Sequence, residues 1–383
     1  MKFRGRNIKS NREVELVFKN LSCAPRVVFN ILRSKMLIDY KVFSDGFSFL
    51  PSTVVWEITS RCNLRCKMCW LWGENGIGKD FVKDELDIEG IKKIIDDLSS
   101  FKPIVYITGG EPFIRKDMME IIDYIKDKGM ICTLTTNGTL IDDKLAKSLS
   151  DKLDVISFSL DGTKEIHNEI RGKGVFEKCV RGIKAVLKER KSFPIIKINT
   201  TLSDLNYDSI SKMVLLADEL GVDEIQFQHL WFLDEKYADA HKKVIKKIFG
   251  ITTKGIDGYI LGTSKINIDI LYNEILKIKN LETNVNISFY PDINTREELK
   301  RYYTDLSFHF RDRCVNPWFS ATIRSNGDVT PCPDYYIPEY VIGNLKNNFF
   351  SKIWNSEQAK KFRLTLREKG YFPGCIRCCG LFG

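Results

Sequence analysis

Short β-branched runs alternate with amphipathic stretches between Thr53 and Leu230, and this alternation limits the folds open to the chain. The strand candidates are Thr53–Thr59, Ile104–Thr108, Ile131–Thr135, Val155–Ser159, Ile195–Thr201 and Glu224–Gln228. The helix candidates between them are Ile88–Leu98, Asp117–Lys128, Asp142–Leu149, Phe176–Lys188 and Tyr207–Leu220. Strands joined by crossover helices form a parallel sheet that curls toward a barrel and gathers its chemistry where the strands end. We predict an α/β fold with a partial (β/α)6 TIM-like barrel over residues 53–232.

Three further regions are expected around the barrel: a preface over residues 1–52, a barrel-completing or lid region over 233–313, and a small C-terminal α+β extension over 314–383. Elements predicted there are helices Glu235–Phe249 and Ile268–Lys279, strand Val285–Tyr290, a helix opened by the capping-box pair Thr295 and Glu298, the hairpin of Phe319–Arg324 with Val329–Pro331, and helix Glu357–Lys369. In the preface, Arg26–Phe43 has apolar residues at near-helical spacing with basic residues between them. We expect either a helix packed on the barrel or one that docks on a membrane surface or a partner.

Charge and hydropathy restrict the class of protein. Lys and Arg number 59 against 50 Asp and Glu, a formal charge of +9, but no basic block resembles a nucleic-acid-binding arm. No apolar run reaches membrane-spanning length, and the first residues lack a signal-peptide core, so we expect a cytoplasmic protein. Because thiols stay reduced there, the eleven cysteines point to metal or cluster ligation rather than to disulfides.

Three cysteines follow the first predicted strand in a C-x3-C-x2-C spacing: Cys62, Cys66 and Cys69. Three thiolates on one polar loop can hold three corners of a cubic iron–sulfur cluster and leave one iron open to an outside ligand. Zinc is the alternative, although zinc sites usually pair two C-x2-C units. Basic neighbours on the loop favour the thiolate form that either site requires.

The loop resembles the signature of the radical S-adenosylmethionine (SAM) superfamily, whose members share a partial (β/α)6 barrel. The resemblance implies that SAM chelates the open iron of a [4Fe–4S] cluster. One electron from the cluster then cleaves SAM to methionine and a 5′-deoxyadenosyl radical, which abstracts a substrate hydrogen atom. It also implies a reductant protein such as flavodoxin or ferredoxin.

Motifs at the ends of the later strands match positions that contact SAM in this family, and each also has a simpler structural interpretation. Gly109-Gly110-Glu111-Pro112 resembles the motif that holds the SAM amino group, and otherwise forms a turn. Asn137 lies near the SAM pocket in the family, and Asn-Gly is otherwise a tight turn. Ser159 and Asp161 match the positions that contact the ribose of SAM, and helix capping is the alternative for Asp161. Arg171 matches the position that contacts the SAM carboxylate, and an exposed arginine is the alternative. His167 is expected to be structural.

A second set of cysteines closes the chain: Cys314, Cys332, Cys375 and Cys378, with Cys379 adjacent. Four such residues can ligate one complete cluster or one structural zinc. The segment resembles the SPASM/twitch extension of radical SAM enzymes. Because a full SPASM extension carries seven cysteines, we expect the shorter form with one auxiliary [4Fe–4S] cluster, for which Cys379 could replace Cys378. Cys132 and Cys179 are expected in the core, and Cys23 is uninformative.

The sequence therefore predicts a radical SAM oxidoreductase that passes an electron from the substrate to an auxiliary cluster. Two substrate classes stay open: a peptide or protein side chain, and a small hydroxylated or lipid-like molecule. The alternative is a zinc-stabilised, basic binding module without catalysis. The lid region carries no motif that names a residue facing the substrate.

Overall fold

A computed structural model describes residues 15–16, 19–21, 24–74, 76–78, 84–262, 264–293, 295–332 and 337–382, and Cys23 lies outside them. All described strands join one ten-stranded sheet in the order β10-β9-β8-β1-β2-β3-β4-β5-β6-β7. The strands are β1 (Thr53–Thr59), β2 (Ile104–Gly109), β3 (Cys132–Thr136), β4 (Val155–Ser159), β5 (Ile195–Leu202), β6 (Glu224–His229), β7 (Asn286–Tyr290), β8 (Ser320–Ile323), β9 (Asp328–Thr330) and β10 (Gly343–Asn344). From β1 to β7 each strand pairs in parallel with the next. The predicted α/β fold with a parallel, barrel-forming sheet is confirmed.

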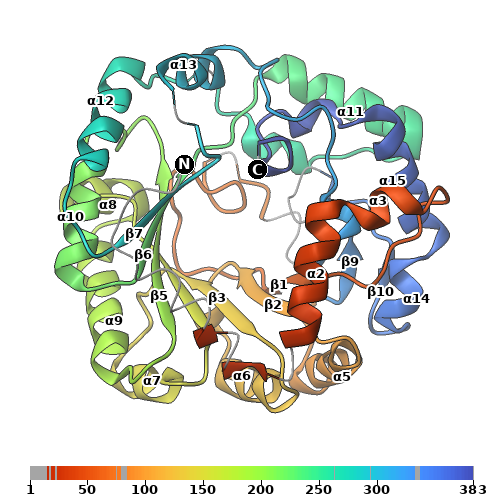
Figure 1. The fold of residues 1–383 in the computed structure, drawn as a ribbon, viewed down its shortest axis with the longest axis horizontal. Helices are drawn as coiled ribbons and strands as arrows, with labels where there is room; N and C mark the ends of the chain where they lie inside the picture. Colours follow the sequence, from red (N-terminus) through yellow and green to blue (C-terminus); the bar gives the residue numbers. More distant parts are fainter. Residues whose placement is uncertain are drawn as a thin grey trace.

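Helices surround the curled sheet on its outer side (Figure 1). They are α5 (Ile88–Ser99), α6 (Met118–Asp127), α7 (Asp143–Leu149), α8 (Lys164–Arg171), α9 (Val175–Glu189), α10 (Ile210–Leu220), α11 (Glu235–Phe249), α12 (Ile268–Lys279), α13 (Arg296–Thr304), α14 (Phe350–Trp354) and α15 (Glu357–Lys369). Isoleucines on α5 and α6 are buried against the strands, as expected for amphipathic crossover helices. The predicted capping box is present at α13, where Thr295 and Glu298 each accept the other's backbone N–H. Cys132 and Cys179 are fully buried, which confirms their predicted place in the core.

The sheet runs through two of the predicted boundaries, the one between the barrel and the lid region and the one between the lid region and the C-terminal extension. Strand β7, from the region predicted as a lid, continues the barrel beyond β6. At the other edge β8, from the C-terminal extension, pairs in parallel with β1 before turning back into β9. The division into a barrel, a lid and an extension stays a prediction, and in the structure these regions share one sheet.

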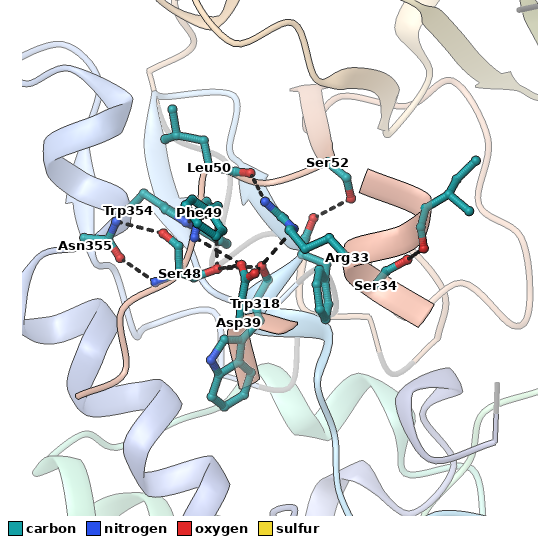
Figure 2. Close-up of polar contacts among 12 residues, drawn as sticks. Arg33, Ser34, Asp39, Ser48, Phe49, Leu50, Ser52, Trp318, Trp354 and Asn355 are labelled. Carbon is teal, nitrogen blue, oxygen red and sulfur yellow. Dashed lines mark hydrogen bonds and ion pairs between the residues drawn. The ribbon is translucent and has the colours of Figure 1, made fainter. Parts of the chain in front are cut away.

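The preface helix predicted over Arg26–Phe43 is two helices, α2 (Ala24–Met36) and α3 (Ile38–Val42). The chain breaks between them because Leu37 adopts a left-handed conformation with φ 53°. Polar residues of α2 face inward: Arg33 is fully buried, its Nη1 donates to the Leu50 carbonyl at 3.0 Å, and its Nε lies 3.6 Å from Asp39 Oδ1. Figure 2 shows this pair at the centre of a polar cluster.

Large apolar side chains of α2 are exposed instead: Val28, Phe29, Ile31, Leu32 and Met36. The helix is thus amphipathic, as predicted, and one of the basic residues between its apolar positions, Arg33, lies in the interior. No helix in the described part of the chain is long and apolar enough to span a bilayer. Docking of this segment on a membrane surface stays a prediction.

The cluster around Asp39 fixes the preface to the C-terminal extension. Asp39 Oδ2 lies 2.7 Å from the Ser48 hydroxyl, which is 2.8 Å from the carbonyl oxygen of Trp318 (Figure 2). The Asn355 side chain bonds both the N–H and the carbonyl of Ser48. On α15, the buried Arg363 donates to the carbonyls of Gly46, Pro317 and Trp354. Preface and extension therefore form one packed unit beside β1.

Candidate functional site

The Gly109–Gly110 motif lies directly on the chain that leads into the cysteine loop. Gly110 donates its N–H to the Thr59 carbonyl at 2.8 Å, and Glu111 donates to the Arg61 carbonyl at 2.9 Å. A Cβ on Gly109 would lie 2.2 Å from the Thr59 oxygen, and one on Gly110 would lie 2.0 Å from the Arg61 oxygen. Only glycine permits so close an approach, so the motif fixes the base of the cysteine loop.

Glu111 holds the ends of β2 and β3 together. Its carboxylate, 1% exposed, accepts hydrogen bonds from the Thr136 hydroxyl and the Asn137 N–H, both at 2.8 Å, and from the Phe113 N–H at 3.2 Å. Burial raises the pKa of Glu111, and these hydrogen bonds counteract the rise. The carboxylate is thus occupied by protein donors, which leaves the backbone of the two glycines as the part of the motif available to a ligand. Buried Pro112 opens a short 3-10 turn after it.

Asn137 connects this network to the cysteine loop. Its Nδ2 donates to Asn63 Oδ1 at 2.9 Å, and its Oδ1 accepts from both the N–H and the hydroxyl of Thr139. The side chain is 6% exposed. The structure therefore brings the polar motifs after the first three strands to one rim, as the sequence predicts.

Asp161 and Arg171 form a buried ion pair beside the second cysteine of the loop. Arg171 Nε donates to Asp161 Oδ2 at 2.5 Å, and its Nη1 lies 3.7 Å from Cys66 Sγ. Asp161 Oδ1 accepts the Thr201 N–H at 2.9 Å, so both carboxylate oxygens are used. Arg171 is thus a largely buried arginine that lies beside the cysteine loop. Asp161 is the group that orients it.

His167 contacts Asp161 directly, and Ser159 precedes Asp161 by two residues at the end of β4. In the described part of the chain, the half-buried Ser159 hydroxyl has no hydrogen-bond partner, so it is available to a ligand. His167 is fully buried, and its Nδ1 accepts the Asp161 N–H at 3.0 Å. Burial lowers the pKa of His167 to about 4. The neutral ring supports Asp161, which agrees with the structural role predicted for it.

The three loop sulfurs have the surroundings of cluster ligands. Backbone N–H groups of Leu64 and Trp72 point at Cys62 Sγ and Cys69 Sγ, at 3.4 Å and 3.3 Å. Hydrogen bonds of this kind stabilise thiolates that bind iron. Burial raises the pKa of the Cys66 thiol to about 11, so cluster binding must displace its proton. Among the described residues, no three His, Cys, Asp or Glu side chains converge as ligands of a single metal ion. The donor set fits a cluster spread over one loop.

The terminal cysteines gather around the last turn of the chain. Gly380 donates its N–H to Cys378 Sγ at 3.4 Å, and a Cβ on Gly380 would lie 2.8 Å from Cys314 Sγ. Cys378 also donates its N–H to the Cys375 carbonyl at 2.9 Å, and half-buried Cys332 follows β9. Cys378 Sγ and Cys379 Sγ are 4.0 Å apart, so either can serve as the last ligand of the predicted auxiliary site.

A cavity of about 170 Å³ opens beside the cysteine loop, and the sequence did not reveal it. Its walls come from the loop itself, from the segment after β5, from the ends of β6 and α13, and from the chain around Leu261. They include Lys67, Met68, Ser203, Asp204, Phe232 and Tyr303. The lining residues come from separate segments of the chain and form no motif, so only their position at strand and helix ends could have marked them.

Comparison with known proteins gives the family. A model of the radical SAM superfamily matches residues 56–217, and a model of an iron–sulfur cluster-binding domain matches residues 314–379. The Fe-coproporphyrin III synthase of Methanosarcina barkeri is 33% identical over 342 residues, which cover 85% of this chain and 80% of that protein. The chain belongs to the radical SAM superfamily. It is therefore an enzyme with a SAM-binding [4Fe–4S] cluster, SAM and an auxiliary cluster, and not a non-catalytic zinc module.

Two further relatives bear on the radical SAM enzyme described here. The AdoMet-dependent heme synthase of Methanosarcina barkeri is 29% identical over 327 residues, covering 82% of this chain and 85% of that protein. The structure of Streptococcus suis SuiB bound to the precursor peptide SuiA superposes with a TM-score of 0.59 at 15% identity, covering 88% of this chain and 70% of that chain. At that identity the likeness shows the fold alone.

Replacing Asp161 by Asn is expected to raise the KM for SAM by about 10- to 100-fold in this radical SAM enzyme. Asparagine keeps the acceptor for Thr201 but removes the charge that orients Arg171. The measurement is 5′-deoxyadenosine formation as a function of SAM concentration. Asp223→Asn is the matched control, because Asp223 also pairs with an arginine, Arg190, and accepts a backbone N–H, from Ile196. Equal KM values for the two variants would contradict the role given to Asp161.

Proposed function

We propose that this enzyme oxidises a carboxylated tetrapyrrole held in the cavity between its two cluster sites. Cys62, Cys66 and Cys69 would hold the SAM-binding cluster, and Cys314, Cys332, Cys375 and Cys378 the auxiliary cluster. The backbone of Gly109 and Gly110, together with Asn137, Ser159 and Arg171, would bind SAM, with Asp161 positioning Arg171.

The observation that carries the proposal is one cavity that is lined by residues of the cysteine loop and linked by side-chain contacts to the terminal cysteines. Lys67 and Met68, next to Cys66, line it on one side. On the other side Tyr303 lines it and packs on Tyr302, with ring centroids 5.0 Å apart. Arg377, adjacent to Cys378, lies 4.7 Å from the Tyr302 ring. A substrate in the cavity would thus be near the loop that starts the reaction and near the site that can take an electron.

When bound, the clusters and SAM supply a 5′-deoxyadenosyl radical that abstracts a hydrogen atom and an acceptor for the electron that the substrate then releases. The residues of the chain position and shield these groups. Arg171 supplies a positive charge 3.7 Å from Cys66 Sγ, where the carboxylate of SAM would bind. The apolar walls around Phe232 keep water away from the reacting carbon.

The choice of substrate rests on two of the relatives that are matched over most of their length, whose names are those of enzymes that make iron tetrapyrroles. The first of these matches covers 85% of this chain, and residues of the predicted barrel and lid regions line the cavity. The cavity walls are largely apolar, with leucine and isoleucine side chains beside Phe232, which suits part of a flat, apolar ring system. A peptide substrate has weaker support, because SuiB resembles this chain in fold alone. A tetrapyrrole was not among the substrate classes considered from the sequence.

Anaerobic incubation with dithionite, SAM and iron coproporphyrin III tests the proposal. We expect 5′-deoxyadenosine to form together with a change in the mass of the porphyrin, measured by liquid chromatography and mass spectrometry. The protein should be brown and contain about eight irons, as two [4Fe–4S] clusters require.

Three outcomes separate the parts of the proposal. Abortive 5′-deoxyadenosine without a mass change in iron coproporphyrin III, haem or their metal-free forms would refute the tetrapyrrole assignment. About four irons per chain after reconstitution would refute the auxiliary site. A colourless, iron-free preparation would refute both cluster sites.

A further inference from the structure

Tyr303 and His229 form a buried hydrogen-bonded pair at the wall of the cavity. The Tyr303 oxygen lies 2.6 Å from His229 Nδ1. His229 ends β6 and is fully buried, whereas Tyr303 comes from α13 and lines the cavity. The ring of Phe232 stacks on Tyr303 at 6.1 Å and an interplanar angle of 2°, which fixes the tyrosine ring.

The surroundings of His229 decide which atom of the pair donates. Burial lowers the pKa of His229 to about 3, so the ring is neutral at physiological pH and carries a single N–H. Its Nε2 is sealed from solvent and has no hydrogen-bond partner among the described residues. A proton on Nε2 would leave a buried donor unsatisfied, which is more costly than leaving a bare lone pair. The proton therefore belongs on Nδ1, from which it is donated to the Tyr303 oxygen and leaves the phenol hydrogen free.

Other polar side chains on the described cavity wall already donate to protein acceptors. Lys67 donates to Glu169, Ser203 to Asn206, and Ser264 to Asp204. Among the hydroxyl groups on the described part of this wall, the phenol of Tyr303 is thus the one without an assigned acceptor.

We propose that Tyr303 donates a hydrogen bond to an oxygen of the substrate and that His229 is the positioning residue that orients it. The inference rests on the proposed function for the identity of the cavity as the substrate site. Anchoring one substrate oxygen there fixes which C–H bond faces the cysteine loop. Tyr303 thereby couples radical formation to productive hydrogen abstraction.

Kinetics with iron coproporphyrin III test the donor. Tyr303→Phe should lower kcat/KM for the conversion of iron coproporphyrin III by about 10- to 100-fold. It should also lower the yield of product per 5′-deoxyadenosine formed. His229→Asn, which keeps an N–H near the Nδ1 position, should lose less than His229→Leu. Tyr371→Phe is the matched control, because Tyr371 also bonds a histidine, His309, at 3.0 Å but does not line the cavity. An unchanged product yield in Tyr303→Phe would overturn the proposal.

The state of His229 can be measured without any substrate. The chain has four histidines, so the nitrogen NMR spectrum of the oxidised holoenzyme labelled with ¹⁵N-histidine can be assigned with His229→Asn. We expect a neutral His229 with its proton on Nδ1 and a shift of that signal in Tyr303→Phe. A proton on Nε2 would overturn the proposed orientation. If the unmodified enzyme does not convert iron coproporphyrin III, the substrate assignment fails, while this spectrum still decides whether Tyr303 is free to donate.

Discussion

Replacing Cys66 by Ala is expected to lower 5′-deoxyadenosine formation by at least about 10³-fold, to the background of the assay. The Cys66 sulfur lies 3.7 Å from Arg171 Nη1, so its loss removes one corner of the proposed cluster site and the sulfur that contacts this guanidinium. Two thiolates cannot hold a cluster that needs three. Iron per chain should also fall by about four after reconstitution.

Two variants make this result interpretable. Cys132→Ala removes a buried cysteine from β3 without touching either cluster site and should keep full iron content and activity. Cys332→Ala should lose about four irons but still form 5′-deoxyadenosine, because we assign that cysteine to the proposed auxiliary site. Retention of 5′-deoxyadenosine formation by Cys66→Ala would remove the loop from the mechanism.

Replacing Arg363 by Met should lower the free energy of unfolding by about 3–5 kcal/mol, the largest stability effect we expect from one substitution. The guanidinium is 1% exposed and donates to the carbonyls of Gly46, Pro317 and Trp354. Methionine fills much of the volume but leaves these acceptors buried without donors. The midpoint of urea unfolding, followed by tryptophan fluorescence, measures the loss because Trp318 and Trp354 adjoin the site.

Lys361→Met is the matched control on the same helix. Lys361 is exposed, so its replacement should change the free energy of unfolding by no more than about 0.5 kcal/mol. Similar midpoints for the two variants would mean that the preface is not joined to the extension through Arg363.

The barrel could be predicted from the sequence because its signals are local. Strands β1 and β4 begin and end at the predicted residues, since β-branched runs and polar strand ends are read directly from the chain. Helix α10 begins at Ile210 rather than at Tyr207, because Asn206 holds the preceding residues in a turn through the Ser203 N–H and the Asp161 carbonyl. Such a side-chain contact has no periodic signature.

Features that depend on distant contacts could not be predicted. The sequence places Arg33 among the apolar residues of a helix, but its buried position depends on Asp39 and on the Leu50 carbonyl. Glu111 was predicted as a cofactor residue from its motif, and the hydrogen bonds from Thr136 and Asn137 that occupy it come from another strand end. The pair of Tyr303 and His229 joins residues far apart in the chain and matches no motif.

The pairing of β8 with β1 has a consequence for how the chain is made. Contacts at this seam join residues 267 positions apart, such as Ser52 and Phe319. At typical ribosomal speeds, β1 would emerge roughly 13–50 s before its partner. During that interval the strand that leads into the cysteine loop has one open hydrogen-bonding edge, which other chains could pair with. Escape from aggregation would thus depend on the arrival of the residues that form β8.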